Sequence, residues 1–508
     1  MSDTLIDLDS LRSRPSGAIA WHDWEQSAFD RAARERKPVL LSIGASWCHG
    51  CAVMDRSTYA APDIIATVNA RSVPVRVDAD RRPDINERYN LDGWPTTALL
   101  TPAGEVLTGS TYVTPDMMRR MLGEACDALA ARYDELMARG ARAALARRQA
   151  PASPRYEPDT GAPAWMAEHL LAQADVEHGG FGGEGKFLHI GALRFALAWS
   201  EAAGDERLAG LVGAALDGML RGAIVDDVDG GFFRYAASRD WSRPHTEKML
   251  EDQAGLIQLL LEASQVLHRD EYRERALDVV RYVRRTLSDE TRGGFFSSQR
   301  ADEAYYAVSG SIRRTLEPPA VDRTLFTDVN AQGAVAFLRA GELLGDVDLG
   351  RMGLRSLEHV LLATYQPGQG VAHHRAGVRG LLTDHAHAAW GLLHLHDATA
   401  NPTYAMLAEE LIRTALRTMW DEPHGGFLDR APAADDVGLL RDPVKPLALN
   451  CLAARVLARL AVLTGQEELW RFAGAALGSQ TGVYRTLGAA GASYAAAVMD
   501  VFSMTTDR

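Results

Sequence analysis

The pattern of apolar and polar positions divides the chain into two regions. In residues 1–150, apolar runs of strand length alternate with stretches of helical spacing, which predicts an α/β domain. The apolar run at 38–43 predicts a buried strand, and residues 73–78 and 97–101 predict two further strands. A single helix over 115–148 is expected to close this domain.

Residues 151–508 have a different pattern, in which amphipathic helical stretches dominate. Twelve helices are expected, at residues 163–176, 189–203, 206–222, 246–268, 270–287, 327–345, 347–364, 381–399, 402–419, 443–464, 466–478 and 489–503. Gly-Gly-Phe turns follow alternate helices, at residues 179–181, 230–232, 293–295 and 425–427, with weaker copies at Gly370 and Gly482. A helical hairpin cannot bury its own apolar stripe, so six hairpins are expected to close into an all-α (α/α)6 toroid. The Gly-Gly-Phe turns then lie at one end of the ring, which we call the mouth.

Length, charge and cysteine content narrow the class of protein. At 508 residues the chain exceeds what one hydrophobic core supports, and a proline-rich connector at 151–163 predicts a domain boundary near residue 150. The net charge of −13 argues against a nucleic-acid partner, and no apolar window approaches the roughly 18 residues that a membrane span needs. The first ten residues are acidic and lack the apolar centre of a secretion signal. With only four cysteines, this composition predicts a cytoplasmic protein without a membrane partner.

The most specific chemical motif is a pair of cysteines, Cys48 and Cys51, at the junction of a predicted strand and a predicted helix. This placement is typical of a thioredoxin-type redox site. The start of a helix favours a thiolate, so Cys48 is expected to be the nucleophile and Cys51 the resolving thiol. Half of a zinc site is the alternative, but Cys126 and Cys451 are far apart in the sequence and form no second pair.

Pro95 opens the strand that follows the predicted redox helix, which is the order of elements in thioredoxins. In that fold the proline is cis and its backbone faces the disulfide, so we expect Pro95 to present the substrate. An ordinary proline at the start of a strand is the alternative. The neighbouring side chains of Trp47, His49 and Trp94 are candidates for substrate binding.

A second group of candidate residues lies near the start of the helix predicted at 246–268. His245 and Asp252 are seven residues apart and should share a helical face, and Glu247 adds a carboxylate. A histidine near a carboxylate is suited to proton transfer, and sugar hydrolysis requires two carboxylates. The alternative is that these residues cap the helix and form a buried network between hairpins. The histidines at 385, 387, 394 and 396 do not have the spacing of known metal motifs, so neither a metal nor another cofactor is expected.

Many positions of the N-terminal region resemble a known family. They are Trp24, Phe29, Lys37-Pro38, Leu41 to Gly44, Cys48-His49, Cys51, Val53 to Arg56, Val77-Asp78, Arg82 to Ile85, Tyr89 and Gly93 to Pro95. This series resembles the DUF255 thioredoxin-domain family, which includes spermatogenesis-associated protein 20-like and YyaL-like members. The family usually has Trp and His where this chain has Gly50 and Ala52. Working thioredoxins have a buried aspartate where this chain has Ser42, so Cys51 is expected to lack a proton acceptor.

The second half also resembles that family, and with it the six-hairpin glycosidases and N-acylglucosamine 2-epimerases. The matching positions include the Gly-Gly-Phe turns and four candidate ligand-binding residues, Lys186, Arg234, Trp241 and Asp384. Lys186 could bind an anionic or hydroxylated ligand, or could instead neutralise a nearby carboxylate. The resemblance implies a thiol–disulfide active protein fused to a carbohydrate-enzyme-like toroid, with a protein thiol or disulfide, or a small molecule such as a carbohydrate, as partner. The alternative is a sugar epimerase or hydrolase acting through His245, Glu247 and Asp252, in which the thioredoxin-like domain is structural.

Overall fold

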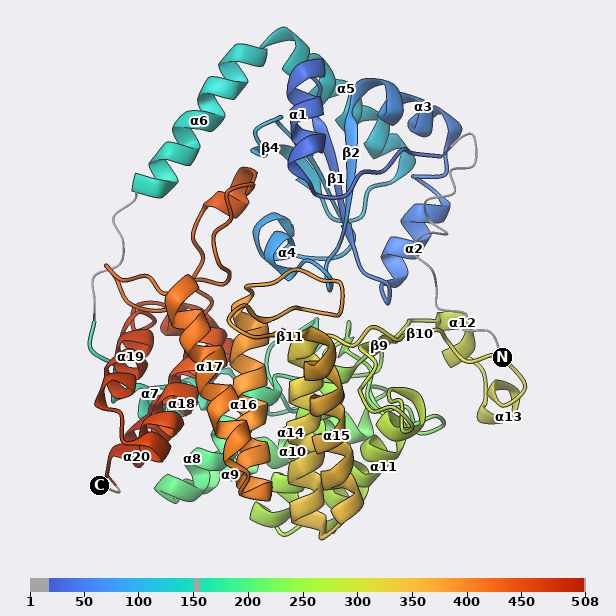
Figure 1. Cartoon of the computed structure of the whole chain (residues 1–508). Helices are drawn as coiled ribbons and strands as arrows, with labels where there is room; N and C mark the ends of the chain where they lie inside the picture. Colours follow the sequence, from blue (N-terminus) through green and yellow to red (C-terminus); the bar gives the residue numbers. More distant parts are fainter. Residues whose placement is uncertain (1–17, 150–155, 507–508) are drawn as a thin grey trace. The chain divides into compact units, whose positions relative to one another are not determined.

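A computed structural model describes residues 18–149 and 156–506 of the chain. It contains two compact units (Figure 1). The sheet unit comprises Met1–Pro151 and Pro432–Pro443, and the helical unit comprises Ala152–Ala431 and Val444–Arg508. The sequence-based division at residue 150 therefore differs in one segment, Pro432–Pro443, which groups with the first unit because it packs against that unit's core.

The sheet unit is built on a four-stranded sheet of order β2-β1-β3-β4. Its central strand β1 (Val39–Gly44) runs parallel to β2 (Val73–Asp78) and antiparallel to β3 (Thr96–Leu100). Strand β4 (Val106–Ser110) is antiparallel to β3 at the edge. The first five residues of β1 are buried, as expected of an apolar run covered on both faces.

Helices cover both faces of this sheet. They are α1 (Gln26–Glu35), α2 (His49–Arg56), α3 (Pro62–Arg71), α4 (Pro83–Tyr89) and α5 (Pro115–Ala131). Helix α6 (Tyr133–Gln149) follows α5 and contacts it. Side chains of α1 and α4 share a core with one face, and those of α2, α3 and α5 share a core with the other. The expected single helix over 115–148 is wrong, because the chain leaves helical geometry at Arg132 (φ −131°, ψ 36°).

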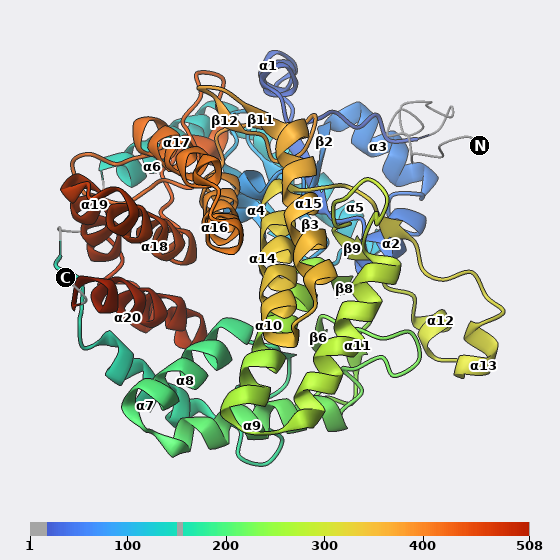
Figure 2. The ribbon, with the colours of Figure 1, turned by 60° about the horizontal axis from the view of Figure 1, so that its bottom comes forward.

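The helical unit is a closed ring of paired helices (Figure 2). The inner helices are α8 (Ile190–Ala203), α10 (Leu250–Val266), α14 (Thr327–Leu344), α16 (Leu382–Thr399), α18 (Leu447–Thr464) and α20 (Ala492–Thr506). Each inner helix packs against the next, and α20 packs against α8, which closes the ring. The outer helices are α7 (Ala162–Gln173), α9 (Glu206–Arg221), α11 (Asp270–Thr286), α15 (Val347–Thr364), α17 (Pro402–Thr418) and α19 (Glu467–Gly478). The (α/α)6 prediction is confirmed.

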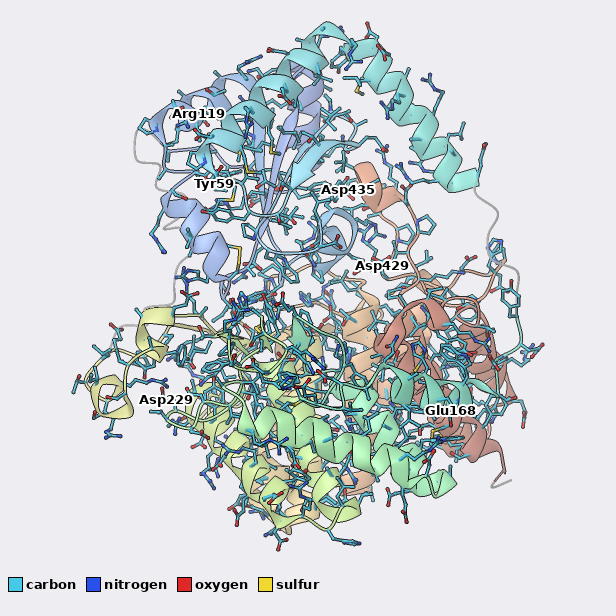
Figure 3. The ribbon with its side chains drawn as sticks, turned by 180° about the vertical axis from the view of Figure 1, so that it is seen from behind. Tyr59, Arg119, Glu168, Asp229, Asp429 and Asp435 are labelled. Carbon is cyan, nitrogen blue, oxygen red and sulfur yellow. A yellow bond between two sulfur atoms is a disulfide. The ribbon has the colours of Figure 1, made fainter. Side chains whose placement is uncertain are left out.

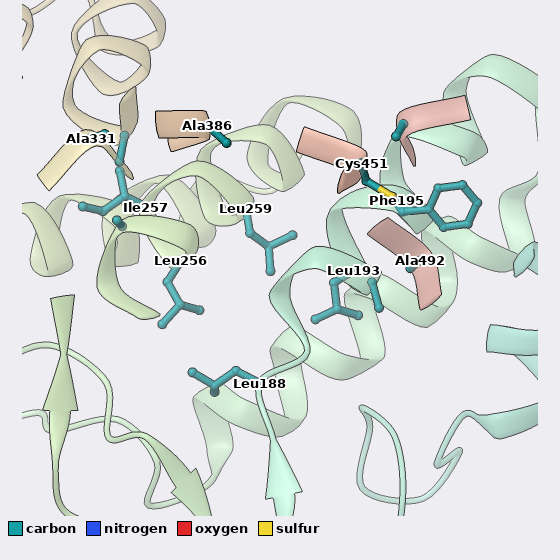
Figure 4. Packing of buried hydrophobic residues seen from close by; sticks show 14 of the residues in the cluster. Leu188, Leu193, Phe195, Leu256, Ile257, Leu259, Ala331, Ala386, Cys451 and Ala492 are labelled. Carbon is teal, nitrogen blue, oxygen red and sulfur yellow. The ribbon is translucent and has the colours of Figure 1, made fainter. Parts of the chain in front are cut away.

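The centre of the ring is apolar. Figure 4 shows part of this core, where Leu193 of α8, Leu259 of α10 and Cys451 of α18 lie among buried side chains. Among the described residues, α18 is the one helix long and apolar enough to cross a membrane, with a mean hydropathy of 1.6. It packs against α16, α19 and α20, so its apolar surface serves the core of the ring.

Short strands and helical turns connect the long helices. They are β5 (Lys186–Phe187), β6 (Tyr235–Ala236), β7 (Pro244–His245), β8 (Lys248–Met249), β9 (Ser298–Gln299), β10 (Val321–Asp322), β11 (Tyr365–Gln366), β12 (Gly370–Val371), α12 (Glu303–Tyr306), α13 (Gly310–Arg313), η2 (Gly438–Arg441), η3 (Tyr484–Thr486) and η4 (Gly488–Gly491). The predicted helix at 246–268 begins at Leu250, because the preceding residues pair as strands. His245 and Asp252 therefore do not share a helical face, and that prediction is wrong.

The Gly-Gly-Phe turns are corners held by a repeated set of hydrogen bonds. At the second turn, Lys248 donates to the carboxylate of Asp226 and to the carbonyl of Gly230, both at 2.7 Å. Gln253 then pairs with both backbone groups of Phe232 at 2.8 Å. The amides of Asn330 and Asn450 bind the phenylalanines of the third and fourth turns in the same way. In the second, third and fourth turns, an amide of the following inner helix thus satisfies the buried backbone groups of the phenylalanine.

Candidate functional site

In the sheet unit, the candidate site is a disulfide between Cys48 and Cys51, whose Cα atoms are 5.3 Å apart. Cys48 is the N-cap of α2, and its sulfur accepts a hydrogen bond from the backbone N–H of Cys51 at 3.1 Å. This donor and the helix dipole stabilise a thiolate on Cys48 when the pair is reduced. Only 4% of Cys48 is exposed, whereas Cys51 is half-buried. Electrostatics therefore favours Cys48 as the reactive sulfur, and exposure favours Cys51.

The loop that carries Pro95 lies against the disulfide turn. The Trp94–Pro95 peptide is cis, which confirms the expected geometry. A β-carbon added to Gly50, between the two cysteines, would lie 3.1 Å from Cδ of Pro95 and 3.6 Å from the carbonyl oxygen of Trp94. The structure thus brings together Pro95 and the cysteine pair, as the thioredoxin-like order of elements predicted.

The aromatic candidates form a frame beside this turn. The indole N–H of Trp47 donates to Asp80 at 2.8 Å, and that of Trp94 donates to Asn86 at 3.0 Å. The two indole rings meet edge to face with centroids 5.4 Å apart. Trp47 is buried, whereas Trp94 and His49 keep part of their surface, so the latter two are better placed to touch a bound substrate.

A cluster of hydroxyl groups occupies the region where working thioredoxins have a buried carboxylate. Ser42 and Thr97 are cross-strand neighbours on β1 and β3. The hydroxyl of Tyr59, a residue labelled in Figure 3, bonds to Thr97 at 3.0 Å and also to Ser42. Burial raises the pKa of Tyr59, although both hydrogen bonds oppose the shift. Further along β1, a β-carbon on Gly44 would lie 3.3 Å from the sulfur of Cys51. The polar groups at positions 42, 59 and 97 are therefore neutral and poor proton acceptors at physiological pH.

In the helical unit, an exposed aromatic ladder lies on the sheet of order β5-β6-β7. Phe187, Tyr235 and His245 are cross-strand neighbours, so their rings stack. The ring centroids of Phe187 and Tyr235 are 4.7 Å apart, and those of Tyr235 and His245 are 4.2 Å apart. Phe187 remains 47% exposed and His245 is also exposed, so the ladder offers a flat apolar surface.

A cavity of about 240 Å³ adjoins this ladder. Its lining residues are Phe187, Leu188, His189, Ile190, Arg234, Glu251 and Asp252. Burial raises the pKa of Asp252 to about 8, and the neighbouring charge of Glu251 adds to the shift while Arg234 opposes it. Burial also raises the pKa of Glu251, even though part of its side chain is exposed where it borders the cavity. One protonated and one ionised carboxyl group can therefore coexist here near neutral pH.

Two predicted ligand-binding residues have structural roles instead. Lys186 is fully buried, where its ammonium group binds Asp175 and the carbonyl of Gly179. Trp241 is fully buried and donates its indole N–H to the carbonyl of His178 at 3.1 Å. Neither side chain is presented to a ligand in this structure, because both hold the first Gly-Gly-Phe turn.

The remaining predicted residues lie at different depths. Glu247 is buried, and one of its carboxylate oxygens has no hydrogen-bond partner among the described residues. Asp384 is fully buried and lies 2.9 Å from Nδ1 of His373. Burial raises the pKa of Asp384 to about 6, although His373 opposes the shift. Sequence reasoning did not select Glu251, although two adjacent acids at the start of a helix were a usable signal.

The geometry defines a thioredoxin-like domain with a Cys-x-x-Cys pair and a cis-proline loop, followed by an (α/α)6 helical ring. Residues 6–145 match a family model described as "Protein of unknown function, DUF255", so the N-terminal region is a DUF255 thioredoxin-like domain. The chain is 33% identical to spermatogenesis-associated protein 20 of Mus musculus over 307 residues, which cover 56% of this chain and 39% of that protein. The match thus spans about two fifths of the length of this relative.

Two further similarities each cover part of the chain. A segment of 77 residues, 15% of this chain, is 32% identical to the thiol:disulfide interchange protein DsbD 2 of Pseudomonas aeruginosa and covers 13% of that protein. The structure of cellobiose 2-epimerase from Bacillus thermoamylovorans superposes with a TM-score of 0.53 at 11% identity, over 64% of this chain and 87% of that one. At this identity the second similarity establishes the fold alone.

Proposed function

We propose that the sheet unit carries out thiol–disulfide exchange with a protein or small-molecule partner. The observation that supports this most is the Cys48–Cys51 disulfide at the start of α2, with the cis-Pro95 loop against it. The Cys48 thiolate would attack one sulfur of a partner disulfide, forming a mixed disulfide and releasing one partner thiolate. The Cys51 thiolate would then attack Cys48, closing the protein disulfide and releasing the second partner thiol, so that two electrons pass to the partner.

Because position 42 carries a serine and no carboxylate, the second step is expected to be slow. Cys51 must lose its proton before it can attack, and Ser42 offers no carboxylate to accept that proton. A slow second step lengthens the life of the mixed disulfide, which suits selective exchange with a bound partner better than rapid general reduction. We further propose a cytoplasmic location, since four cysteines in 508 residues are typical of a reducing compartment.

Trapping the mixed disulfide tests this proposal. The Cys51→Ser variant, reduced and mixed with oxidised glutathione, should hold one glutathione on Cys48, detected by intact mass and peptide mapping. The double variant Cys48→Ser, Cys51→Ser should hold no glutathione. Cys126→Ser, which removes an unrelated buried thiol, is the control. Labelling of Cys126 or Cys451 in place of Cys48 would contradict the proposal.

A second candidate function is sugar binding or conversion at the cavity of the helical unit. The specific observation is that the ladder of Phe187, Tyr235 and His245 adjoins a cavity with two acids, Glu251 and Asp252. Aromatic faces stack on sugar rings. A carboxylic acid can protonate the leaving-group oxygen while a neighbouring carboxylate accepts the proton of an attacking water. Glu251 replaces Glu247 in this candidate, because Glu247 is buried and does not line the cavity.

A panel of mono- and disaccharides, screened by calorimetry, tests the second candidate. Tyr235→Ala should weaken the binding of any sugar that the wild type binds. Asp252→Asn should abolish conversion while keeping binding. Equal sugar affinity of the wild type and Tyr235→Ala would show that the aromatic ladder does not contribute to sugar binding.

A further inference from the structure

Three side chains from separate segments of the helical unit come together near the start of two inner helices. Asp328 lies in the first turn of α14, Asp384 lies in the first turn of α16, and His373 follows β12. Their potential ligand atoms all lie within 4.8 Å of one another. Nδ1 of His373 is 2.9 Å from a carboxylate oxygen of Asp384 and 3.9 Å from one of Asp328.

Backbone and hydroxyl contacts fix this arrangement. The backbone N–H of Thr327 donates to the carbonyl of His373 at 2.8 Å, and the Thr327 hydroxyl donates to the carbonyl of Ala372 at 2.6 Å. The hydroxyl of Thr383 donates to Asp328 at 2.9 Å, which links the starts of α16 and α14. These bonds hold the loop and both helices in place without using the imidazole of His373 or the carboxylate of Asp384.

One carboxylate oxygen of the cluster also lacks a hydrogen-bond partner among the described residues. Asp384 is fully buried, and its Oδ2 atom has no hydrogen-bond partner among the described residues. His373 is only 3% exposed. A buried carboxylate oxygen without a donor is unfavourable, and a cation beside it would remove that deficit.

We propose that Asp328, His373 and Asp384 bind one divalent first-row transition-metal ion, such as Mn²⁺ or Zn²⁺. Metal–ligand bonds of about 2.0–2.2 Å hold their ligand atoms roughly 3 to 4 Å apart, and the separations of 2.9 and 3.9 Å fall in that range. One imidazole nitrogen with two carboxylates favours such ions over Mg²⁺ or Ca²⁺, which prefer ligands that are all oxygen. Nδ1 of His373 must be unprotonated to bind the ion.

The site is separate from both proposed functions, although it lies close to the cavity. Asp328 is within electrostatic reach of Glu251, which borders the cavity. A cation held by Asp328 would therefore offset the repulsion among the acids at the mouth. The metal histidine is His373, whereas the histidines at 385, 387, 394 and 396 that the sequence drew attention to are outside the cluster.

Metal binding by the full chain tests the proposal directly. The protein is stripped with a chelator and titrated with Mn²⁺, whose electron paramagnetic resonance signal falls as free ion becomes bound; Zn²⁺ is titrated in parallel by calorimetry. We expect one ion per chain in the wild type and at least a tenfold loss of affinity in Asp384→Asn and Asp328→Asn. Asp328 is partly exposed, so its variant keeps the test valid if Asp384→Asn does not fold.

A matched control comes from another histidine–aspartate pair in the same unit. His424 lies 3.2 Å from Asp421 but belongs to no three-ligand group among the described residues. Asp421→Asn should bind the ion as the wild type does. Absence of a stoichiometric ion in the wild type, or equal affinity in all three variants, would overturn the proposal.

Discussion

At the scale of single residues, the two sulfurs of the redox pair differ in the factors that control reactivity. The N-terminus of α2 stabilises a thiolate on Cys48, whereas Cys51 has the more exposed side chain. We expect electrostatics to prevail, so iodoacetamide should label Cys48 first in the reduced protein near neutral pH, as read by peptide mass. Burial raises the pKa of Cys126 and of Cys451, so these should react last. Faster labelling of Cys51 would show that access decides instead.

Ser42 sets the expected rate of the second exchange step. Replacing it with aspartate puts a proton acceptor among the hydroxyls of Tyr59 and Thr97, which can hydrogen-bond the new carboxylate. Ser42→Asp should speed reduction of insulin disulfides on the order of 10²-fold, the typical value of general-base help. Ser42→Asn, of the same size but without a base, is the control. An unchanged rate in folded Ser42→Asp would show that the proton acceptor is not limiting.

Asp252 makes the stability of the helical unit depend on pH. Its pKa is raised from 3.8 to about 8, so between these values the folded state holds a proton that the unfolded state has released. Stability from this group is therefore present at low pH and is lost as pH rises toward 8. Asp252→Asn should raise the melting temperature at about pH 8 and change it little at about pH 4, measured by calorimetry. Glu201→Gln on the exposed part of α8 is the control, and an equal gain at both pH values would contradict the assignment.

At the scale of elements, the second, third and fourth Gly-Gly-Phe turns depend on one amide from the inner helix that follows each of them. Asn330 of α14 binds both the N–H and the carbonyl of Phe295, and both partners are buried. Asn330→Ala leaves these backbone groups unpaired, and each such loss costs about 1–3 kcal/mol. We expect a fall of about 2–4 kcal/mol in the free energy of unfolding, measured by urea denaturation. Asn401→Ala, at the exposed cap of α17, should cost only about 1 kcal/mol, and equal costs would show that the turn is not held in this way.

At the scale of the whole molecule, the sheet unit is completed by a segment that comes late in the chain. Val437 and Leu440 are buried in its core, and the N–H of Leu439 donates to the hydroxyl of Tyr89 at 2.9 Å. Arg88 donates to the carbonyls of Leu439 and Asp442. The chain therefore passes between the two units three times, which couples the folding of the sheet unit to residues remote in sequence.

A fragment experiment tests this completion. Residues 1–151 alone should melt at a lower temperature than with an added peptide of residues 432–443, because the peptide restores apolar burial against α4. The same peptide with Leu440→Asp should have no effect, since a charge cannot replace a buried leucine. Equal melting temperatures with both peptides would show that the segment contributes nothing to the unit's stability.

The sequence by itself determined the features that depend on near neighbours. Periodicity at 3.6 residues predicted each of the twelve long helices of the ring, and the repeat of the Gly-Gly-Phe turns predicted its closure. The order of strand, Cys48, Cys51 and Pro95 predicted the redox geometry, because all of these lie within one small fold. Local spacing failed at residues 244–249, where pairing with other strands replaced the expected helical turn.

The tertiary structure alone decided which polar residues meet. Asp328, His373 and Asp384 are as much as 56 positions apart in sequence, and the packing of α14 against α16 brings their ligand atoms within 4.8 Å. The tertiary structure also decided which side chains are buried. The sequence left Lys186 as a candidate ligand-binding residue, whereas in the structure it is fully buried and bonds to Asp175. Which groups lose contact with water, and which charges then become neighbours, depends on long-range packing that no local pattern encodes.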